Sequence, residues 1–342
     1  MQTSKIKTKH LSEDHASRKL EAISRGVKKA IRFLIFLGII LIILSIGSYF
    51  VNPLRCEMDN VAFEGEVYFS GLLSEESDTV DVVILGNSQT FGLLSPMHLW
   101  QNTGIASYIA GKPGLGLSEE YYSLKTILKK QTPKLVILET NNIFDTMGIL
   151  RETKHAAANA FGYYFPIVKY HSIWKKYVSE DKPKTRHHNG FSIRADVVPY
   201  EGGDYLAYTD ELEKTDPITM HYLNKVIDLC RENNINVLLV YAPSPGTFSY
   251  RRHNTVQAYA DTNNIPFVDM NVLGDEIGIN LQTDILDGGE HVNLYGTLKM
   301  TNYLEKYLTK HYSLPDRRQD KRYAKWHERA AEFMEELNGL LQ

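Results

Sequence analysis

The feature that most constrains this chain is a run of 22 residues without a charge, from Phe33 to Leu54. As a helix, with a rise of about 1.5 Å per residue, the run would be roughly 33 Å long, close to the hydrocarbon thickness of a bilayer. A buried core helix of this length normally has a polar face, and we identify none in this run. The sequence therefore predicts one transmembrane helix over residues 32–54.

The charges on either side of this run are unequal. Residues 1–32 hold nine Lys or Arg and three Asp or Glu, whereas the rest of the chain has an excess of nine acidic residues. By the positive-inside rule, residues 1–31 form a basic cytoplasmic tail and everything after the helix is extracytoplasmic. A cleaved signal peptide is the competing interpretation. The run is long for a signal peptide and no A-x-A-like site follows it, so we favour an uncleaved signal anchor and a single-pass membrane protein.

The remaining part, about 290 residues, is long enough for one large α/β domain. Its negative charge does not suggest nucleic-acid binding. The chain has two cysteines, Cys56 and Cys230, too few for a disulfide framework or a four-cysteine zinc site. We expect Cys230 to be a small core residue of a helix.

Buried strands alternate with helices along this part, which predicts a three-layer α/β/α sandwich with a parallel sheet. The expected strands are residues 80–88, 133–142, 236–245 and 265–271, and the expected helices are 117–131, 219–233, 252–263 and 294–310. We interpret residues 55–79 as a stalk, 145–215 as an insertion that could serve as a substrate lid, and 313–342 as a C-terminal docking helix.

Polar residues suited to nucleophilic catalysis follow the predicted strands. Ser88 follows the first, Asn141 the second, and His291 with nearby aspartates comes near the end of the domain. Functional residues of open α/β sheets lie at the carboxyl ends of strands. A serine hydroxyl is a weak nucleophile unless a histidine accepts its proton, and the histidine needs a carboxylate to orient it.

Other catalytic motifs are missing from the sequence. Ser88 lies in G-N-S-Q-T and not in a G-x-S-x-G elbow, the segment GKPGLGL lacks the ending of a Walker A motif, and no G-x-G-x-x-G pattern follows Gly86. We therefore expect no nucleotide or other cofactor and no catalytic metal.

The motifs resemble the SGNH/GDSL hydrolase superfamily, whose members have a flavodoxin-like sheet. VVILGNS is similar to its first block and SYIAGKPGLG to its second; ETNN and DGGEH partly match the third and last blocks. The order along the chain agrees, and the resemblance covers roughly residues 80–312, the expected catalytic domain. It implies Ser88 as nucleophile and His291 as general base. It also implies an oxyanion hole made of Ser88, Gly114 and Asn141, with Gly111 as an alternative to Gly114.

Two departures from the family pattern matter. Glu139 and Asn142 replace the glycine and the aspartate of the third block. The last block leaves two candidates for the acid of the triad: Asp287, four residues before His291, and Asp284, seven residues before it. We favour Asp287 because its spacing is nearer to that of the family. The HVNLYG segment, with Asn293 and Gly296, is similar to what often follows the family's histidine.

The predicted anchor narrows the resemblance to membrane-anchored extracytoplasmic members, such as teichoic-acid D-alanine transfer proteins and exopolysaccharide O-acetyltransferases. The resemblance implies an acyl donor, a polysaccharide or teichoic-acid-like acceptor in a bacterial cell envelope, and a membrane-bound O-acyltransferase as partner. The expected activity is that of a serine esterase or acyltransferase. The alternative is an inactive surface protein that keeps the fold as a binding or assembly module, which the irregular third and last blocks favour.

Overall fold

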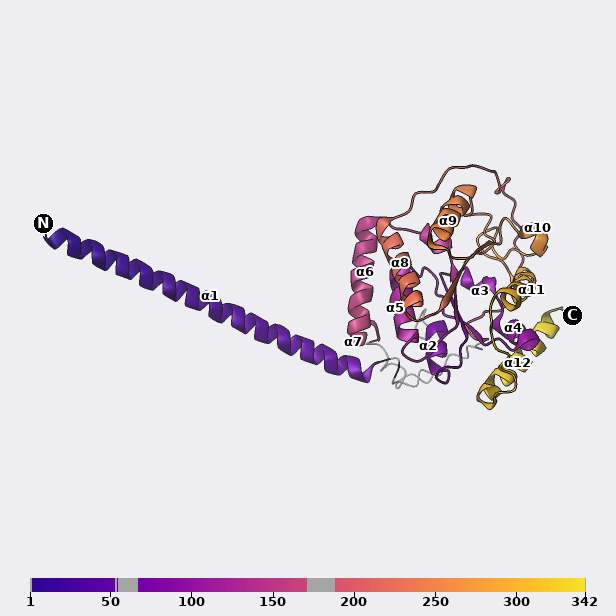
Figure 1. Ribbon diagram of the computed structural model, residues 1–342, viewed down its shortest axis with the longest axis horizontal. Coiled ribbons are helices and arrows are strands. Elements are labelled where there is room, and N and C mark those ends of the chain that lie inside the picture. Colours follow the sequence, from indigo (N-terminus) through magenta and orange to yellow (C-terminus); the bar gives the residue numbers. More distant parts are fainter. Residues whose placement is uncertain (1, 53, 55–66, 171–187, 342) are drawn as a thin grey trace.

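The computed structural model describes residues 2–52, 54, 67–170 and 188–341. It consists of a long N-terminal helix, α1 (Gln2–Phe50), that projects from an α/β domain (Figure 1). The stretch Ile23–Phe50 of α1 is long and apolar enough to cross a membrane, and its most apolar part is not buried against the domain. A signal sequence has the same properties, so the finding is one apolar N-terminal helix of either kind.

The domain is built on a five-stranded sheet in the order β2-β1-β3-β4-β5, with every neighbouring pair parallel. The strands are β1 (Val82–Leu85), β2 (Ser107–Ile109), β3 (Leu135–Glu139), β4 (Asn236–Tyr241) and β5 (Phe267–Asp269). Strands β1 and β3 are buried throughout, as expected for a parallel sheet covered on both faces. The predicted α/β fold with a parallel, helix-flanked sheet is confirmed.

Strand β2 was not among the expected strands, although its residues lie in the segment that resembles the second block. It has only three residues, Ser-Tyr-Ile, which is too short to show a hydrophobic period. Its place is decided by pairing, because Val83 of β1 lies opposite Tyr108. The sheet order places β1 next to β3, where chain connections leave toward opposite edges of the sheet. Ligands of open α/β sheets bind at such a point.

Helices cover both faces of the sheet (Figure 1). On one face α3, α4 and α11 pack together, with α12 against α4, and on the other α5, α6 and α8 pack together. Their bounds are α3 (Thr90–Leu93), α4 (Pro96–Thr103), α11 (Leu294–His311), α12 (Ala324–Leu341), α5 (Leu117–Ile127), α6 (Ile149–Tyr164) and α8 (Pro217–Glu232). The other described helices are α2 (Val67–Ser74), α7 (Pro166–Tyr170), α9 (Tyr250–Asn263), α10 (Gly274–Ile277) and the 3-10 turns η1 (Asn141–Ile143) and η3 (Lys321–Tyr323).

The C-terminal helix α12 packs through aromatic side chains. Trp326 of α12 and Tyr323 just before it have ring centroids 5.3 and 5.4 Å from that of Trp100 in α4, and all three rings are almost completely buried. Aromatic side chains bury the largest apolar areas, so this contact holds the C-terminal segment on the domain.

Some predicted segments lie partly outside the described residues. These are the stalk, of which 55–66 including Cys56 is not described, and the insertion, of which 171–187 is not described. The rest of the insertion contributes α6, α7 and an irregular stretch from 188 to 215. Cys230 is fully buried in α8, and burial raises the pKa of its thiol to about 12. It is therefore an unreactive core residue.

Candidate active site

Ser88 lies in a tight turn between β1 and α3. Gly86 begins the turn with φ of 152°, and a Cβ there would come within 2.7 Å of the side chains of Glu139 and Thr90. Glycine is therefore required for the chain to turn this close to β3. Asn87 stabilises the turn, because its Oδ1 accepts from the N–H of Gln89 at 3.0 Å.

The fold brings Ser88 and His291 together across 203 residues of sequence. Ser88 Oγ lies 2.7 Å from His291 Nε2, and His291 Nδ1 lies 2.5 Å from Asp287 Oδ2. These distances are within hydrogen-bond reach of a nucleophile, a base and an orienting carboxylate. The arrangement matches the geometry of a serine–histidine–aspartate triad.

Asp287 is tied to the backbone as well as to the imidazole. Its Oδ1 accepts from the N–H of His291 at 2.8 Å and from that of Glu290 at 3.1 Å. Partial burial raises the pKa of Asp287, but the hydrogen bonds from His291 and Glu290 outweigh it and hold the pKa below its usual value. The carboxylate is therefore charged at neutral pH and can stabilise a protonated imidazole.

The alternative aspartate, Asp284, has partners other than His291. It is buried and accepts from the Lys299 ammonium at 2.6 Å and from the N–H of Asn280 at 2.8 Å. Of the two aspartates considered from the sequence, Asp287 is therefore the one beside His291, while Asp284 ties a loop to α11.

Asn293 holds the segment that carries His291. Its Oδ1 caps α11 by accepting from the N–H groups of Tyr295 at 3.0 Å and Gly296 at 3.3 Å, and its Nδ2 donates to the carbonyl of Thr283 at 2.8 Å. A side chain that caps a helix and ties down the preceding loop fixes the position of a histidine two residues before it.

Asn141 follows β3, next to the strand that carries Ser88. Its Oδ1 accepts from the Tyr241 hydroxyl at 3.2 Å and from the Arg252 guanidinium at 3.4 Å, and its backbone N–H donates to both Glu139 oxygens at 3.1 Å. Because the amide oxygen faces these two donors, the amide Nδ2 points away from Tyr241 and Arg252. A fixed amide donor at this strand end is suited to binding an oxyanion.

The two glycines considered for the second block differ in their surroundings. Gly111 is buried, and a Cβ there would meet Thr90 Oγ1 at 1.9 Å and the Gly86 carbonyl at 3.1 Å. Gly114 is exposed with φ of 67°, and apart from its chain neighbours no atom of the described residues lies within 4 Å of its Cβ position. Gly111 thus packs against the turn that carries Ser88, whereas Gly114 serves a turn farther along the loop.

Glu139, which departs from the family glycine, is completely buried beneath Gly86. Burial raises its pKa to about 8, although hydrogen bonds from the backbone N–H groups of Asn141, Ala242 and Thr140 lower it. Its side chain connects the ends of β3 and β4 and positions the backbone of Asn141.

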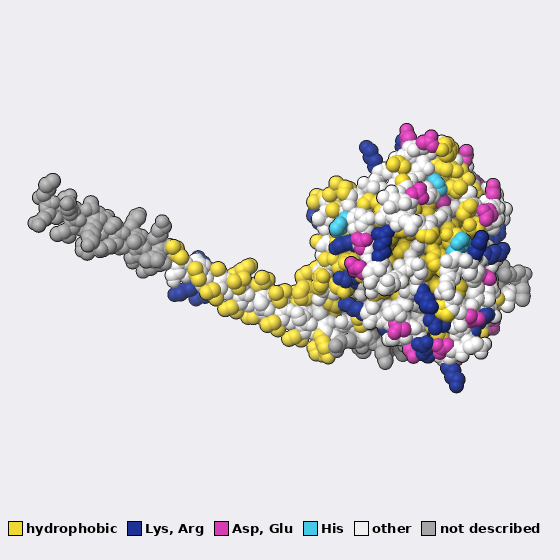
Figure 2. All heavy atoms as spheres, viewed as in Figure 1, with side chains coloured by type: hydrophobic (Ala, Val, Ile, Leu, Met, Phe, Trp, Pro, Cys, Tyr) yellow, Lys and Arg dark blue, Asp and Glu magenta, His cyan; other side chains and the backbone are white. Residues whose placement is uncertain are grey.

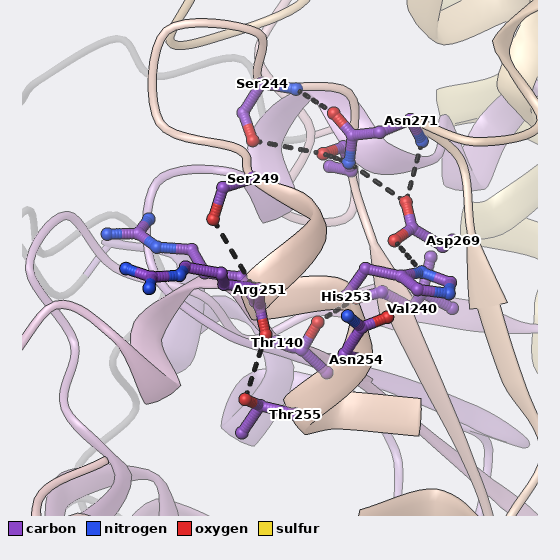
Figure 3. Close-up of polar contacts among 12 residues, drawn as sticks. Thr140, Val240, Ser244, Ser249, Arg251, His253, Asn254, Thr255, Asp269 and Asn271 are labelled. Carbon is purple, nitrogen blue, oxygen red and sulfur yellow. Dashed lines mark hydrogen bonds and ion pairs between the residues drawn. The ribbon is translucent and has the colours of Figure 1, made fainter. Parts of the chain in front are cut away.

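A second acid–histidine pair, not anticipated from the sequence, lies at the end of β5 (Figure 3). His253 Nδ1 lies 2.7 Å from Asp269 Oδ2, while Asp269 Oδ1 accepts from the N–H of Asn271 at 2.9 Å. An aspartate ending one strand and a histidine on the preceding helix would have been the sequence signal. Among the described residues no serine hydroxyl is hydrogen-bonded to His253.

A small hollow of about 10 Å³ adjoins the triad. It is lined by Ser88, Phe91, Gly92, Ser192, Arg194, His291, Val292, Asn293, Leu294 and Thr297. Two of these, Ser192 and Arg194, come from the predicted insertion, and the Arg194 guanidinium lies 5.4 Å from the centre of the Phe91 ring. The insertion therefore forms one wall beside the proposed nucleophile.

A metal ion fits this site poorly. Possible ligand atoms of Asp287, Glu290 and His291 lie within 4.8 Å of one another, which makes them a candidate group within the described part of the chain. Both nitrogens of His291 already have hydrogen-bond partners, Ser88 and Asp287, so an ion would have to break one of these bonds.

Comparisons with known proteins give a limited result. No family model and no curated protein matches the sequence. Among solved structures, the chain is similar to a protein assigned as an acylhydrolase from Bacteroides fragilis (17% identity, 71% of this chain and 95% of that one, TM-score 0.38). It is also similar to a GDSL-like lipase from Bacteroides thetaiotaomicron (15% identity, 67% and 87%, TM-score 0.33).

A protein assigned to the lipolytic G-D-S-L family of Desulfitobacterium hafniense is a third similar structure (15% identity, 66% and 97%, TM-score 0.38). These structural neighbours are therefore GDSL-like lipolytic hydrolases.

Proposed function

We propose that this protein is a membrane-anchored, extracytoplasmic serine esterase or acyltransferase that acts on O-acyl groups of a cell-envelope glycopolymer. The observation that carries the proposal is the continuous hydrogen-bonded chain from Ser88 through His291 to Asp287. Each member has the chemistry that its place requires: a hydroxyl, an imidazole and a carboxylate held ionised.

In the first half-reaction, His291 Nε2 takes the hydroxyl proton as Ser88 Oγ bonds to the acyl carbonyl carbon. Asp287 stabilises the imidazolium that results. The tetrahedral intermediate collapses when the bond to the leaving alcohol breaks, and His291 returns the proton to that alcohol. An acyl ester on Ser88 remains.

In the second half-reaction, an acceptor hydroxyl gives its proton to His291 and attacks the Ser88 ester, after which Ser88 recovers the proton. A sugar or polyol hydroxyl as acceptor gives transfer, and water gives hydrolysis. We assign the oxyanion donors to the Ser88 N–H, the Asn141 amide and a glycine N–H of the second block. For that glycine, the contact with the Ser88 turn favours Gly111 over Gly114.

The proposed cellular location is based on α1. Its basic N-terminal flank and apolar stretch support a single-pass anchor with the domain outside the cytoplasm, where envelope polymers are found. An acyl donor must then reach the outer surface, which agrees with a membrane-bound O-acyltransferase as the partner that supplies it. That partner and the polymer class rest on the resemblance alone.

The test is labelling of the full-length protein in intact cells with a fluorophosphonate probe. We expect the wild type to be labelled, Ser88→Ala to be unlabelled, and the matched control Ser244→Ala to be labelled like the wild type. Protease added outside should digest the labelled domain. A wild type that neither reacts with the probe nor turns over any ester would instead indicate a binding module without catalysis.

A further inference from the structure

The arginines in the described part of the domain differ in what their guanidinium groups contact. Six of them form an ion pair with a carboxylate, and these are Arg231, Arg251, Arg317, Arg318, Arg322 and Arg329. Arg252 donates to Asn141 Oδ1, and Arg151 is exposed on α6. Arg194 is half-buried, and its guanidinium has no ion pair and no hydrogen bond with another described residue. It is therefore a half-buried charge without a counterion in the part of the chain that the structure describes.

Arg194 lies beside the proposed nucleophile. It lines the small hollow next to Ser88 and His291, and its guanidinium lies 5.4 Å from the centre of the Phe91 ring. A guanidinium that packs against an aromatic ring keeps its N–H groups for other partners. A positive charge with N–H donors to spare is thus held next to the triad.

Backbone hydrogen bonds fix the segment that carries Arg194. The Arg194 carbonyl accepts from the N–H of Leu294 at 2.7 Å, at the first residue of α11 and close to His291 in the chain. The nearby Asp196 carbonyl accepts from Asn293 Nδ2 at 3.1 Å. This segment is therefore tied to the loop that carries His291, and a substitution of the Arg194 side chain leaves both bonds in place.

The hollow lies on the histidine side of the nucleophile. Its lining includes His291 and residues 292–294, whereas Asn141 and Gly111, which we assign to the oxyanion hole, are not among the described lining residues. In the proposed reaction His291 gives a proton to the leaving alcohol and takes one from the acceptor hydroxyl. Groups beside the histidine therefore face the alcohol part of an ester and not its acyl part.

The carboxylates near the triad do not pair with Arg194. Asp287 is engaged by the His291 imidazole and by two backbone N–H groups. Glu290, the other carboxylate near His291, is exposed and forms no ion pair with Arg194. Solvent and salt weaken an exposed charge, so the repulsion that Glu290 exerts on an anion at the hollow is smaller than the attraction of the half-buried guanidinium.

We propose that Arg194 determines specificity by binding an anionic group, a phosphate or a carboxylate, on the alcohol part of the substrate. The hollow has a volume of about 10 Å³, which is about the space of one water molecule, so the anion lies over its opening and not inside it. The guanidinium donors match the paired oxygens of both anions. This inference rests on the proposed function for the alcohol that is acylated, and it selects anionic acceptor polymers over neutral ones.

The test compares three acetate esters that differ in one group: 1-acetylglycerol, 1-acetylglycerol 3-phosphate and 3-O-acetylglycerate. Figure 2 shows apolar side chains along the described part of α1, so the full-length protein is assayed in phosphatidylcholine nanodiscs. For the wild type we expect kcat/KM to be about ten- to a hundredfold higher with at least one anionic ester than with the neutral one, as charge-assisted hydrogen bonds would give. In Arg194→Gln this ratio should fall to about one.

Two further variants separate charge, geometry and position. Arg194→Lys keeps the charge but not the planar fork of donors, so its ratio should lie between those of the wild type and Arg194→Gln. The matched control Arg151→Gln changes an exposed arginine of α6 and should keep the wild-type ratio. A wild-type ratio near one for both anionic esters, or a ratio that Arg194→Gln leaves unchanged, would overturn the proposal.

Binding of the same esters to Ser88→Ala, measured by isothermal titration calorimetry, separates this proposal from the proposed function. An anionic ester should bind about tenfold or more tightly than 1-acetylglycerol, and adding Arg194→Gln should remove the difference. If the wild type turns over no ester but this difference is present, the catalytic proposal fails and the Arg194 site stands. Turnover by the wild type without a preference among the esters would retain the catalytic proposal and overturn this one.

Discussion

Two aspartate–histidine pairs among the described residues differ in what lies on the far side of the imidazole. In the pair Asp287–His291, the second ring nitrogen contacts the Ser88 hydroxyl. In the pair Asp269–His253, the ring packs against the aromatic rings of Tyr250 and Phe267. An oriented imidazole is therefore not enough to indicate catalysis. The difference is the serine hydroxyl that the turn after β1 places beside one of the two imidazoles.

The surroundings of the two carboxylates also differ. The Asp269 side chain is only 3% exposed, whereas that of Asp287 is 37% exposed. A buried pair contributes to the packing of β5 against α9, while a partly open pair allows substrate to approach. Substituting one member at a time tests whether the two pairs respond differently.

The largest expected effect is on ester turnover by the proposed triad. Ser88→Ala or His291→Ala should lower the rate on p-nitrophenyl acetate by on the order of 10⁴-fold or more, with the double variant about as slow as either single one, because a triad acts as a unit. His253→Ala should stay within about threefold of the wild type. Rates are compared with the wild type, and a far-UV spectrum confirms folding. Activity that survives in Ser88→Ala would place the nucleophile elsewhere.

A smaller effect separates the two aspartates near His291. Asp287→Ala should lower turnover, but it should remain about ten- to a hundredfold faster than His291→Ala. The reason is that the backbone around His291 keeps the imidazole partly in position. Asp284→Ala should leave the rate nearly unchanged. A greater loss of activity in a folded Asp284→Ala protein would show that the acid of the triad had been assigned to the wrong residue.

For the free energy of unfolding the order should be reversed, with Asp284→Ala the more damaging of the two substitutions. Asp284→Ala leaves Lys299 without its partner and removes the acceptor for the Asn280 N–H, so we expect a loss of about 1–3 kcal/mol, limited by the partial exposure of Lys299. Asp287→Ala should cost less than about 1 kcal/mol because its side chain is more exposed. Urea unfolding followed by circular dichroism measures both, and the reverse order would contradict the assignment.

A further effect depends on pH and concerns Glu139. Its pKa is raised to about 8, and its carboxyl group is close enough to Asp269 and Glu120 for their charges to interact. Between an unfolded pKa of about 4.3 and 8 the folded protein keeps a proton that the unfolded chain has lost, so this group makes stability fall as pH rises through that window. Glu139→Gln should lack this contribution. We expect its stability relative to wild type to improve from pH 5 to pH 8, measured by thermal unfolding.

Much of the molecule could be predicted from local patterns. The apolar run after a basic segment, the buried β-branched strands such as β3, and the amphipathic helices α8 and α11 follow from the spacing of apolar residues. Local pattern also pointed to Ser88 and His291, since each stands in a short motif beside a strand or helix end. The apolar run, the strands, the helices and the short motifs each depend on residues that are close together in the sequence, so their spacing alone predicts them.

Tertiary structure decided what depends on distant segments. Strand β2 is too short to show a period and exists through its pairing with β1. Spacing favoured Asp287 over Asp284 but left both open, and the structure separates them because Asp287 faces His291 whereas Asp284 faces Lys299. Ser48 in α1 acquired a partner, the N–H of Ile167, only when α7 was placed against that helix. In each case the deciding contact is between segments far apart in the chain or turned by a loop, and sequence spacing does not encode such distances.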